Sequence, residues 1–133
     1  MNVFFDVDDT LIARFDGSLR PLTREVFAKL VSDGHELYVW SGIGLRYFEV
    51  NKFGLRPFVR DLFRKPLAEH RASLVRLGIG VEPHFVIDDH QEVVDVFGGH
   101  LIAPYSFPDP LDREMEVVYE KVVAYSGTFR PMP

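Results

Sequence analysis

The fold is decided by a short stretch close to the N-terminus, Phe4-Phe5-Asp6-Val7-Asp8-Asp9-Thr10. It overlaps residues 2–7, an apolar run of β-branched and aromatic side chains that ends in acids, which is typical of a buried strand. Side chains two positions apart on a strand point to the same face. We therefore expect Asp6 and Asp8 to face one pocket, while Val7 packs on the opposite side.

Predicted strands and helices alternate along the rest of the chain. The patterns indicate further strands at residues 37–40, 58–63, 84–87 and 101–104, and helices at about 23–33, 45–52, 66–77, 91–97 and 111–125. Thr23 is the expected N-cap of the first helix. This alternation predicts an α/β fold, a Rossmann-like three-layer sandwich with a mostly parallel sheet. Ligands of such sheets bind beyond the carboxyl ends of the strands.

Length and composition are those of a globular protein. The 133 residues are 47% hydrophobic and fit one domain over residues 1–133, with 126–133 as a flexible tail. There are no cysteines, which excludes disulfides and thiolate metal sites. No basic signal-peptide region and no apolar run of the ~20 residues of a membrane span occur, so we expect a cytoplasmic protein with no membrane contact. A net charge of -5 argues against a broad nucleic-acid footprint. Nucleic acid stays possible as a partner, but the sequence does not indicate it.

Polar residues gather where the predicted strands end, and they come from separate parts of the sequence. They are Asp6, Asp8, Ser41, Gly42, Lys65, Asp88 and Asp89. Two like charges about 4 Å apart repel by roughly 4 kcal/mol at an effective dielectric of about 20, so the acids need a partner. A hard divalent cation with oxygen ligands would offset the repulsion, and Mg²⁺ is the usual one where phosphate is bound. Asp9 is expected to point away and to be structural.

Three of these residues suit an anion. Ser41 and Gly42 at a strand-to-helix turn offer a hydroxyl and backbone N–H groups. Lys65 could hold a phosphate oxygen and a nucleophilic carboxylate together. Taken alone, a Ser-Gly pair after a strand is more often an ordinary turn, and a single lysine is more often a surface residue.

In order and spacing, these motifs resemble those of the haloacid dehalogenase-like (HAD) superfamily. Residues 4–12 look like its first motif, Asp-x-Asp-x-Thr after a hydrophobic strand. Val39-Trp40-Ser41-Gly42 resembles the second motif, Lys65-Pro66 the third and Val86-Ile87-Asp88-Asp89 the fourth. The resemblance covers residues 2 to about 104.

The resemblance implies roles for the individual residues. Asp6 would be the nucleophile that forms an aspartyl-phosphate, and Asp8 would be general acid to the leaving group and then general base for water. Thr10 would steady the loop, and Ser41 with Gly42 would bind phosphate.

The resemblance also implies a metal site. Mg²⁺ would be held by Asp6, the backbone carbonyl of Asp8 and Asp89. Asp88 would be either a second metal contact or the partner of Lys65.

A cap-less phosphatase is the member type that the resemblance implies. The family's dehalogenases and P-type ATPases lack an acid at the position of Asp8, whereas its phosphatases and mutases have one. Mutases rely on a cap, and no cap fits here. The gap after Leu11 holds a small hairpin or flap within 11–21 and one helix, and the gap from Gly42 to Lys65 holds a helix and a short strand.

The substrate stays open at this point. A site without a cap suits a protein, a nucleic-acid end, or a small molecule enclosed by another subunit, so an oligomer is possible. A phosphatase of nucleotides or nucleic-acid ends is the alternative among enzymes. The alternative outside enzymes is a non-catalytic module that binds metal or phosphate.

Other candidate residues are given structural interpretations. His90 is expected to be a solvated residue at a helix start. Surface positions are expected for the flap residues and for a basic segment, namely Arg14, Phe15, Arg20, Arg56, Arg60 and Arg64. Core positions are expected for the aromatic residues Tyr47, Phe48, Phe53 and Phe58.

Overall fold

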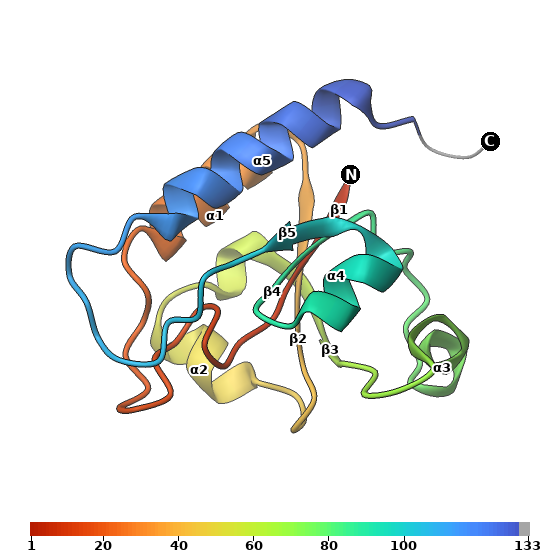
Figure 1. The fold of residues 1–133 in the computed structure, drawn as a ribbon, viewed down its shortest axis with the longest axis horizontal. Coiled ribbons are helices and arrows are strands. Elements are labelled where there is room, and N and C mark those ends of the chain that lie inside the picture. The colour runs from red at the N-terminus through yellow and green to blue at the C-terminus, as the bar shows by residue number, and fades with distance from the viewer. Residues whose placement is uncertain (131–133) are drawn as a thin grey trace.

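The computed structural model describes residues 1–130, and residues 131–133 lie outside the described part. The chain forms an α/β fold around a five-stranded, all-parallel sheet with the strand order β3-β2-β1-β4-β5 (Figure 1). The strands are β1 (Asn2–Phe5), β2 (Glu36–Ser41), β3 (Val59–Arg64), β4 (Phe85–Asp88) and β5 (Gly99–Leu101). The predicted fold class is confirmed, and the strand that leads into Asp6 lies at the centre of the sheet.

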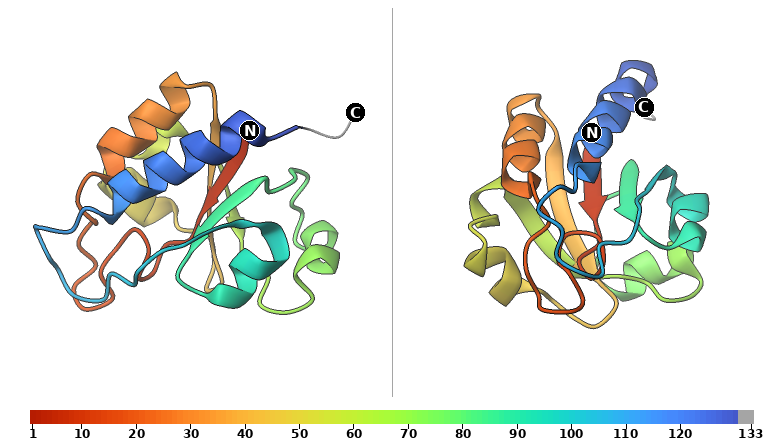
Figure 2. Two further views of the ribbon diagram at one scale, coloured as in Figure 1. Left: turned by 45° about the horizontal axis from the view of Figure 1, so that its top comes forward. Right: turned by 60° about the vertical axis from the view of Figure 1, so that its left-hand side comes forward.

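Helices cover both faces of the sheet and complete a three-layer sandwich. They are α1 (Thr23–Ser32), α2 (Tyr47–Lys52), α3 (His70–Arg76), α4 (Gln91–Phe97) and α5 (Glu114–Thr128), with a short 3-10 helix, η1 (Arg56–Phe58). α1 and α5 lie side by side on one face, and α3 and α4 cover the other (Figure 2). Within residues 1–130, no helix combines the length and the apolar character needed to cross a membrane.

Successive side chains of β1 point to opposite faces of the sheet and enter two separate hydrophobic cores. Val3 and Phe5 point to the core beneath α1 and α5, where Phe5 packs on Phe27 at a ring distance of 4.6 Å. Phe4 points to the opposite core, where its ring lies 4.6 Å from that of Trp40. Burial of each such side chain stabilises the fold by about 1.5–3 kcal/mol. Packing on both faces therefore fixes the register of the strand that positions Asp6.

The first strand is shorter than predicted. It ends at Phe5, and the amide of Asp6 still donates to the carbonyl of Ile87 at 3.0 Å. Beyond it, the carbonyl of Val7 accepts the amides of Thr10, Leu11 and Ile12, so the chain turns into a tight loop. The acids that follow Phe5 therefore lie in a loop at the end of the strand.

Two helix starts differ from the prediction. Leu22, with a left-handed φ of 69°, caps α1, and Thr23 is the first helical residue, whose buried hydroxyl donates to the carbonyl of Arg20. α3 begins at His70 instead of residue 66. Glu69, in a left-handed conformation with φ 49°, is the N-cap of this helix, so residues 66–69 precede it.

The segments around the edge of the site are a flap and short helices. Residues 11–21 form the predicted hairpin. It is closed by two backbone hydrogen bonds, from the N–H of Ala13 to the carbonyl of Ser18 and from the N–H of Arg20 to the carbonyl of Leu11. Between Leu11 and β2 the chain holds only this flap and α1, and between β2 and β3 only α2 and η1. The expected absence of a cap domain agrees with this arrangement.

The C-terminal helix begins and ends three residues later than the predicted range of about 111–125. α5 begins at Glu114, since the turn before it is held by hydrogen bonds to Asp109, and it continues to Thr128. Residues 126–128, expected to belong to a flexible tail, are therefore helical. Beyond the helix, the ring of Phe129 lies 4.6 Å from that of His84.

Candidate active site

The strand ends bring the predicted residues to one edge of the sheet. Asp6 follows the central β1, Asp88 ends the neighbouring β4, and Ser41 ends β2 on the other side. Lys65 follows β3, and its ammonium donates to Asp6 Oδ1 and to Asp88 Oδ2, both at 3.0 Å. The end of each of these strands thus contributes to one site.

Lys65 is the buried cation of the site, with 7% of its side chain exposed. Burial acts to lower the pKa of Lys65, but the carboxylates of Asp6 and Asp88 outweigh it and hold that pKa above its ordinary value. Asp88 is fully buried, and its other oxygen accepts the backbone N–H of His90 at 3.0 Å. Of the two roles left open for Asp88, the structure shows that of a partner to Lys65.

Asp6 is a buried carboxyl held from two sides. In addition to Lys65 on Oδ1, the hydroxyl of Thr10 donates to Oδ2 at 3.2 Å and lies 3.5 Å from Asp89 Oδ1. Burial raises the pKa of Asp6 to about 6, with Asp89 adding to the rise and Lys65 opposing it. Thr10 therefore links the acid of the first motif to that of the fourth.

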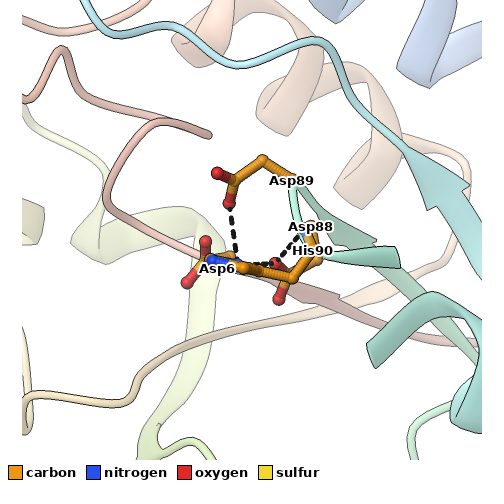
Figure 3. Close-up of side chains that lie close together, drawn as sticks. All are labelled: Asp6, Asp88, Asp89 and His90. Atoms are coloured by element: carbon orange, nitrogen blue, oxygen red, sulfur yellow. Dashed lines mark hydrogen bonds and ion pairs between the residues drawn. The ribbon is translucent and has the colours of Figure 1, made fainter. Parts of the chain in front are cut away.

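A group of potential metal ligands surrounds this carboxyl. One ligand atom each from Asp6, Asp88, Asp89 and His90 lie within 4.8 Å of one another. Figure 3 shows these side chains converging from the ends of β1 and β4. Three of the four residues are carboxylates, whose oxygens suit a hard divalent cation, and the ammonium of Lys65 contacts only two of them, Asp6 and Asp88. Hydrogen bonds already engage both oxygens of Asp88 and both oxygens of Asp6, so an ion bound here would replace some of these contacts.

His90 is a member of the site that the sequence did not assign to it. Its Nδ1 lies 3.0 Å from Asp88 Oδ1 and 3.2 Å from Asp89 Oδ1, although 54% of the side chain is exposed as expected for a helix start. Burial lowers the pKa of His90, but the hydrogen bond to Asp88 and the charge of Asp89 raise it above its ordinary value. The only sequence signal was its place next to two acids.

In the metal-free protein, Asp6 is expected to make stability depend on pH. Its folded-state pKa of about 6 lies above the ordinary 3.8, so folding favours the neutral carboxyl. This contribution is fully present below about pH 4 and is lost as the pH rises through about 6. Relative to Asp6→Asn, the free energy of unfolding of the wild-type protein should fall by roughly 3 kcal/mol between about pH 4 and about pH 8.

Urea unfolding in a chelator at a series of pH values measures this difference. Asp16→Asn is the control, because Asp16 is exposed in the flap and its hydrogen bonds from Ser18 lower its pKa. That variant should show the opposite sign. A wild-type-to-Asp6→Asn difference that stays constant over the pH range would contradict the prediction.

Asp8 has a different set of partners from Asp6. Arg46 holds its carboxylate with two N–H groups, at 2.8 Å to Oδ2 and 3.2 Å to Oδ1. The same guanidinium donates to Ser41 Oγ at 3.2 Å and to Glu49 at 3.0 Å. Sequence reasoning missed Arg46, since no motif surrounds it. The structure therefore joins Asp8 to the candidate phosphate-binding turn through one buried arginine.

The turn after β2 is closely packed. Ser41 Oγ accepts the backbone N–H of Ile43 at 3.4 Å. Gly42 lies against the loop that follows Lys65, where an added Cβ would come within 2.6 Å of the Leu67 side chain. A side chain at position 42 would displace the end of the Leu67 side chain, which is 72% exposed and free to move.

Asp9, just before the flap, and Arg20, within it, both form ion pairs with other residues of the protein. Asp9, in a left-handed conformation with φ 63°, pairs with Arg14 at 2.8 Å, which agrees with its expected structural role. The surface position expected for Arg20 is wrong: it is 1% exposed and binds Asp112 and the backbone carbonyls of Thr10 and Ala103. Arg20 therefore anchors the loop that carries the candidate nucleophile.

A cavity of about 440 Å³ opens next to Asp8, between the flap and α2. Its lining consists of Asp8, Ile12, Ala13, Arg14, Gly17, Ile43, Arg46, Phe48, Glu49, Lys52 and Phe53. Phe53 and Phe58 pack against the core as predicted, but the core position expected for Phe48 is wrong, since 73% of it is exposed. Tyr47, at 40% exposed, is not a core residue either.

No protein-family model matches the chain, and no curated protein matches it significantly.

Proposed function

We propose that this protein is a Mg²⁺-dependent phosphatase of the haloacid dehalogenase-like type, which hydrolyses a phosphomonoester through an aspartyl-phosphate on Asp6. The observation that carries the proposal is the buried ammonium of Lys65, hydrogen-bonded at once to Asp6 and Asp88. Such a lysine orients the carboxylate and supplies positive charge where a phosphate would bind. The meeting of the four motifs at one edge of the sheet supports the same reaction.

In the first step, an oxygen of Asp6 attacks phosphorus, and the bond from phosphorus to the leaving oxygen breaks. Lys65 and the hydroxyl and N–H groups of the Ser41-Gly42 turn would neutralise the phosphate oxygens. Mg²⁺ held by Asp6, Asp89 and the carbonyl of Asp8 would supply positive charge that reduces the repulsion between carboxylate and phosphate.

Asp8 would serve both halves of the reaction. It gives its proton to the leaving oxygen, and later accepts a proton from the water that attacks phosphorus. The bond from phosphorus to Asp6 then breaks and inorganic phosphate leaves. The side chain of Asp8 is 31% exposed and lines the cavity, so a leaving group and water can reach it. To carry the proton, one oxygen of Asp8 would release the N–H of Arg46 that it accepts, while the other keeps the side chain in place.

The direct test is turnover of a generic substrate. The purified protein should release phosphate from para-nitrophenyl phosphate with Mg²⁺ and should stop when the metal is chelated. Acid quenching during turnover should trap a phosphoenzyme, and mass spectrometry should locate the phosphoryl group on Asp6. Absence of phosphate release from a panel of phosphorylated metabolites, peptides and nucleotides would contradict the proposal. Binding of a phosphate mimic without turnover would instead identify a non-catalytic binding module.

A further inference from the structure

The cavity beside Asp8 is where the leaving group of the proposed reaction has to lie. Asp8 can give a proton only to an atom next to its carboxyl group, and its exposed side faces this cavity. At about 440 Å³, the cavity is within the usual range of small-molecule sites. It is larger than a short-chain alcohol requires. The chemistry of its walls therefore bears on the class of substrate.

One wall of the cavity is apolar and partly uncovered. Its apolar residues are Ile12, Ala13, Ile43, Phe48 and Phe53. Phe48 and Ile43 leave 73% and 74% of their surface exposed, although they stand beside a site built for ligands. A flat ring placed on Phe48 would cover this surface and gain an aromatic contact as well. The wall therefore favours a ring in the leaving group.

Within the described part of the chain, two of the three cationic side chains that line the cavity are paired with carboxylates and one is not. Arg46 is engaged by Asp8 and Glu49, and Arg14 is engaged by Asp9. Lys52, by contrast, makes no hydrogen bond or ion pair within residues 1–130, and its ammonium lies 5.3 Å from the ring of Phe53 and 6.0 Å from that of Phe48.

The lining as a whole has the opposite sign to the protein. Three cations and two acids line the cavity, whereas the chain has a net charge of -5. Lys52, next to the exposed ring, is therefore placed to meet an anion of the ligand.

We propose that the substrate is a phosphomonoester whose leaving group is a ring system with a second anionic group, the ring lying on Phe48 and the anion meeting Lys52. This inference rests on the proposed phosphatase function. It names Phe48 and Lys52 as specificity-determining residues, outside the groups that act on phosphorus. The second anion can be a carboxylate on an aromatic ring or a further phosphate on a nucleotide, since both present the same charge to the ammonium.

A matched pair of substrates tests the role of Lys52. The enzyme should prefer meta-carboxyphenyl phosphate over its neutral isostere, meta-carbamoylphenyl phosphate, by about tenfold in kcat/KM, as one charge-assisted contact predicts. Lys52→Met should bring this preference close to one. Lys29→Met is the control, because Lys29 also stands over an aromatic ring, 5.2 Å from Tyr119, but on α1 outside the cavity.

A second comparison tests the role of Phe48. Phe48→Ala should lower kcat/KM for both ring substrates by about fivefold relative to ring-free glycerol phosphate. Phe107→Ala, which removes another exposed ring, paired with Phe15, should not. Because Phe48 is exposed, its truncation leaves no core cavity.

The outcomes separate this inference from the proposed function. Turnover of all substrates without preference for the carboxylate, or equal losses in Lys52→Met and Lys29→Met, would overturn the inference and leave the phosphatase proposal intact. No turnover of any substrate would overturn both. A nucleoside bisphosphate preferred over its monophosphate, with the preference lost in Lys52→Met, would identify the anion as phosphate. The same result with the carboxylate pair alone would identify an aromatic acid.

Discussion

Replacing Asp6 by asparagine is expected to lower the rate of phosphate release by about a thousandfold or more. The amide has the size of the carboxyl group but is far too weak a nucleophile to attack phosphorus. Its oxygen can still accept a hydrogen bond from Lys65, so the fold should be kept. Steady-state assays with para-nitrophenyl phosphate and Mg²⁺ measure the loss, and the trapped phosphoenzyme should disappear with it.

The same exchange made elsewhere serves as the control. Asp16→Asn changes an exposed carboxyl in the flap, held by Ser18 outside the ligand cluster, and should keep wild-type activity. Because burial raises the pKa of Asp6, Asp6→Asn should unfold at a temperature no lower than the wild type in a chelator above about pH 7. A stable Asp6→Asn protein with near wild-type turnover would exclude Asp6 as the nucleophile.

The parts of the site that follow strands could be predicted from the sequence. An apolar run that ends in polar residues marks both a strand and its carboxyl end, so the sequence alone predicts that Asp6, Ser41 and Asp88 lie at one edge of the sheet. In the structure these residues follow or end neighbouring strands of the sheet, as the parallel order requires. The contact of Lys65 with both acids depends on the same geometry.

The parts set by side-chain geometry could not be predicted. Arg46 precedes a helix of six residues, and its guanidinium meets Asp8, which lies 38 positions earlier in the chain. The last strand begins at Gly99, two residues before the apolar pattern suggests. An added Cβ there would lie 1.9 Å from the carbonyl oxygen of Val86, so close approach to β4 sets the position. Neither fact leaves a periodic signal in the sequence.

The orientation of the candidate nucleophile loop depends on Arg20, which does not itself hydrogen-bond to Asp6 or Lys65. Arg20 donates to Asp112 at 2.8 and 3.1 Å, to the carbonyl of Thr10 at 3.1 Å and to that of Ala103 at 2.8 Å. Its guanidinium also lies 5.1 Å from the ring of Tyr105. One side chain thus joins the loop after β1, the segment after β5 and the turn before α5.

Arg20→Ala is therefore expected to destabilise the protein by about 3–5 kcal/mol, the cost of removing one partner of a buried ion pair. Asp112 would be left with its charge unpaired, and two backbone carbonyls would lose their donor. Urea unfolding measures the change. Phosphate release per folded molecule should also fall, because Thr10 hydrogen-bonds to Asp6.

Arg71→Ala is the matched control, because it removes an arginine–carboxylate pair of the same 2.8 Å length in which both side chains are more than half exposed. Exposed pairs contribute about 0–1 kcal/mol, so the two variants should differ by several-fold in their effect on stability. If the Arg20 contacts act as one unit, Arg20→Met with Asp112→Leu should cost less than the sum of the single changes, since no buried charge is left without a partner. Equal and small losses in Arg20→Ala and Arg71→Ala would mean that the buried arginine does not hold the loop.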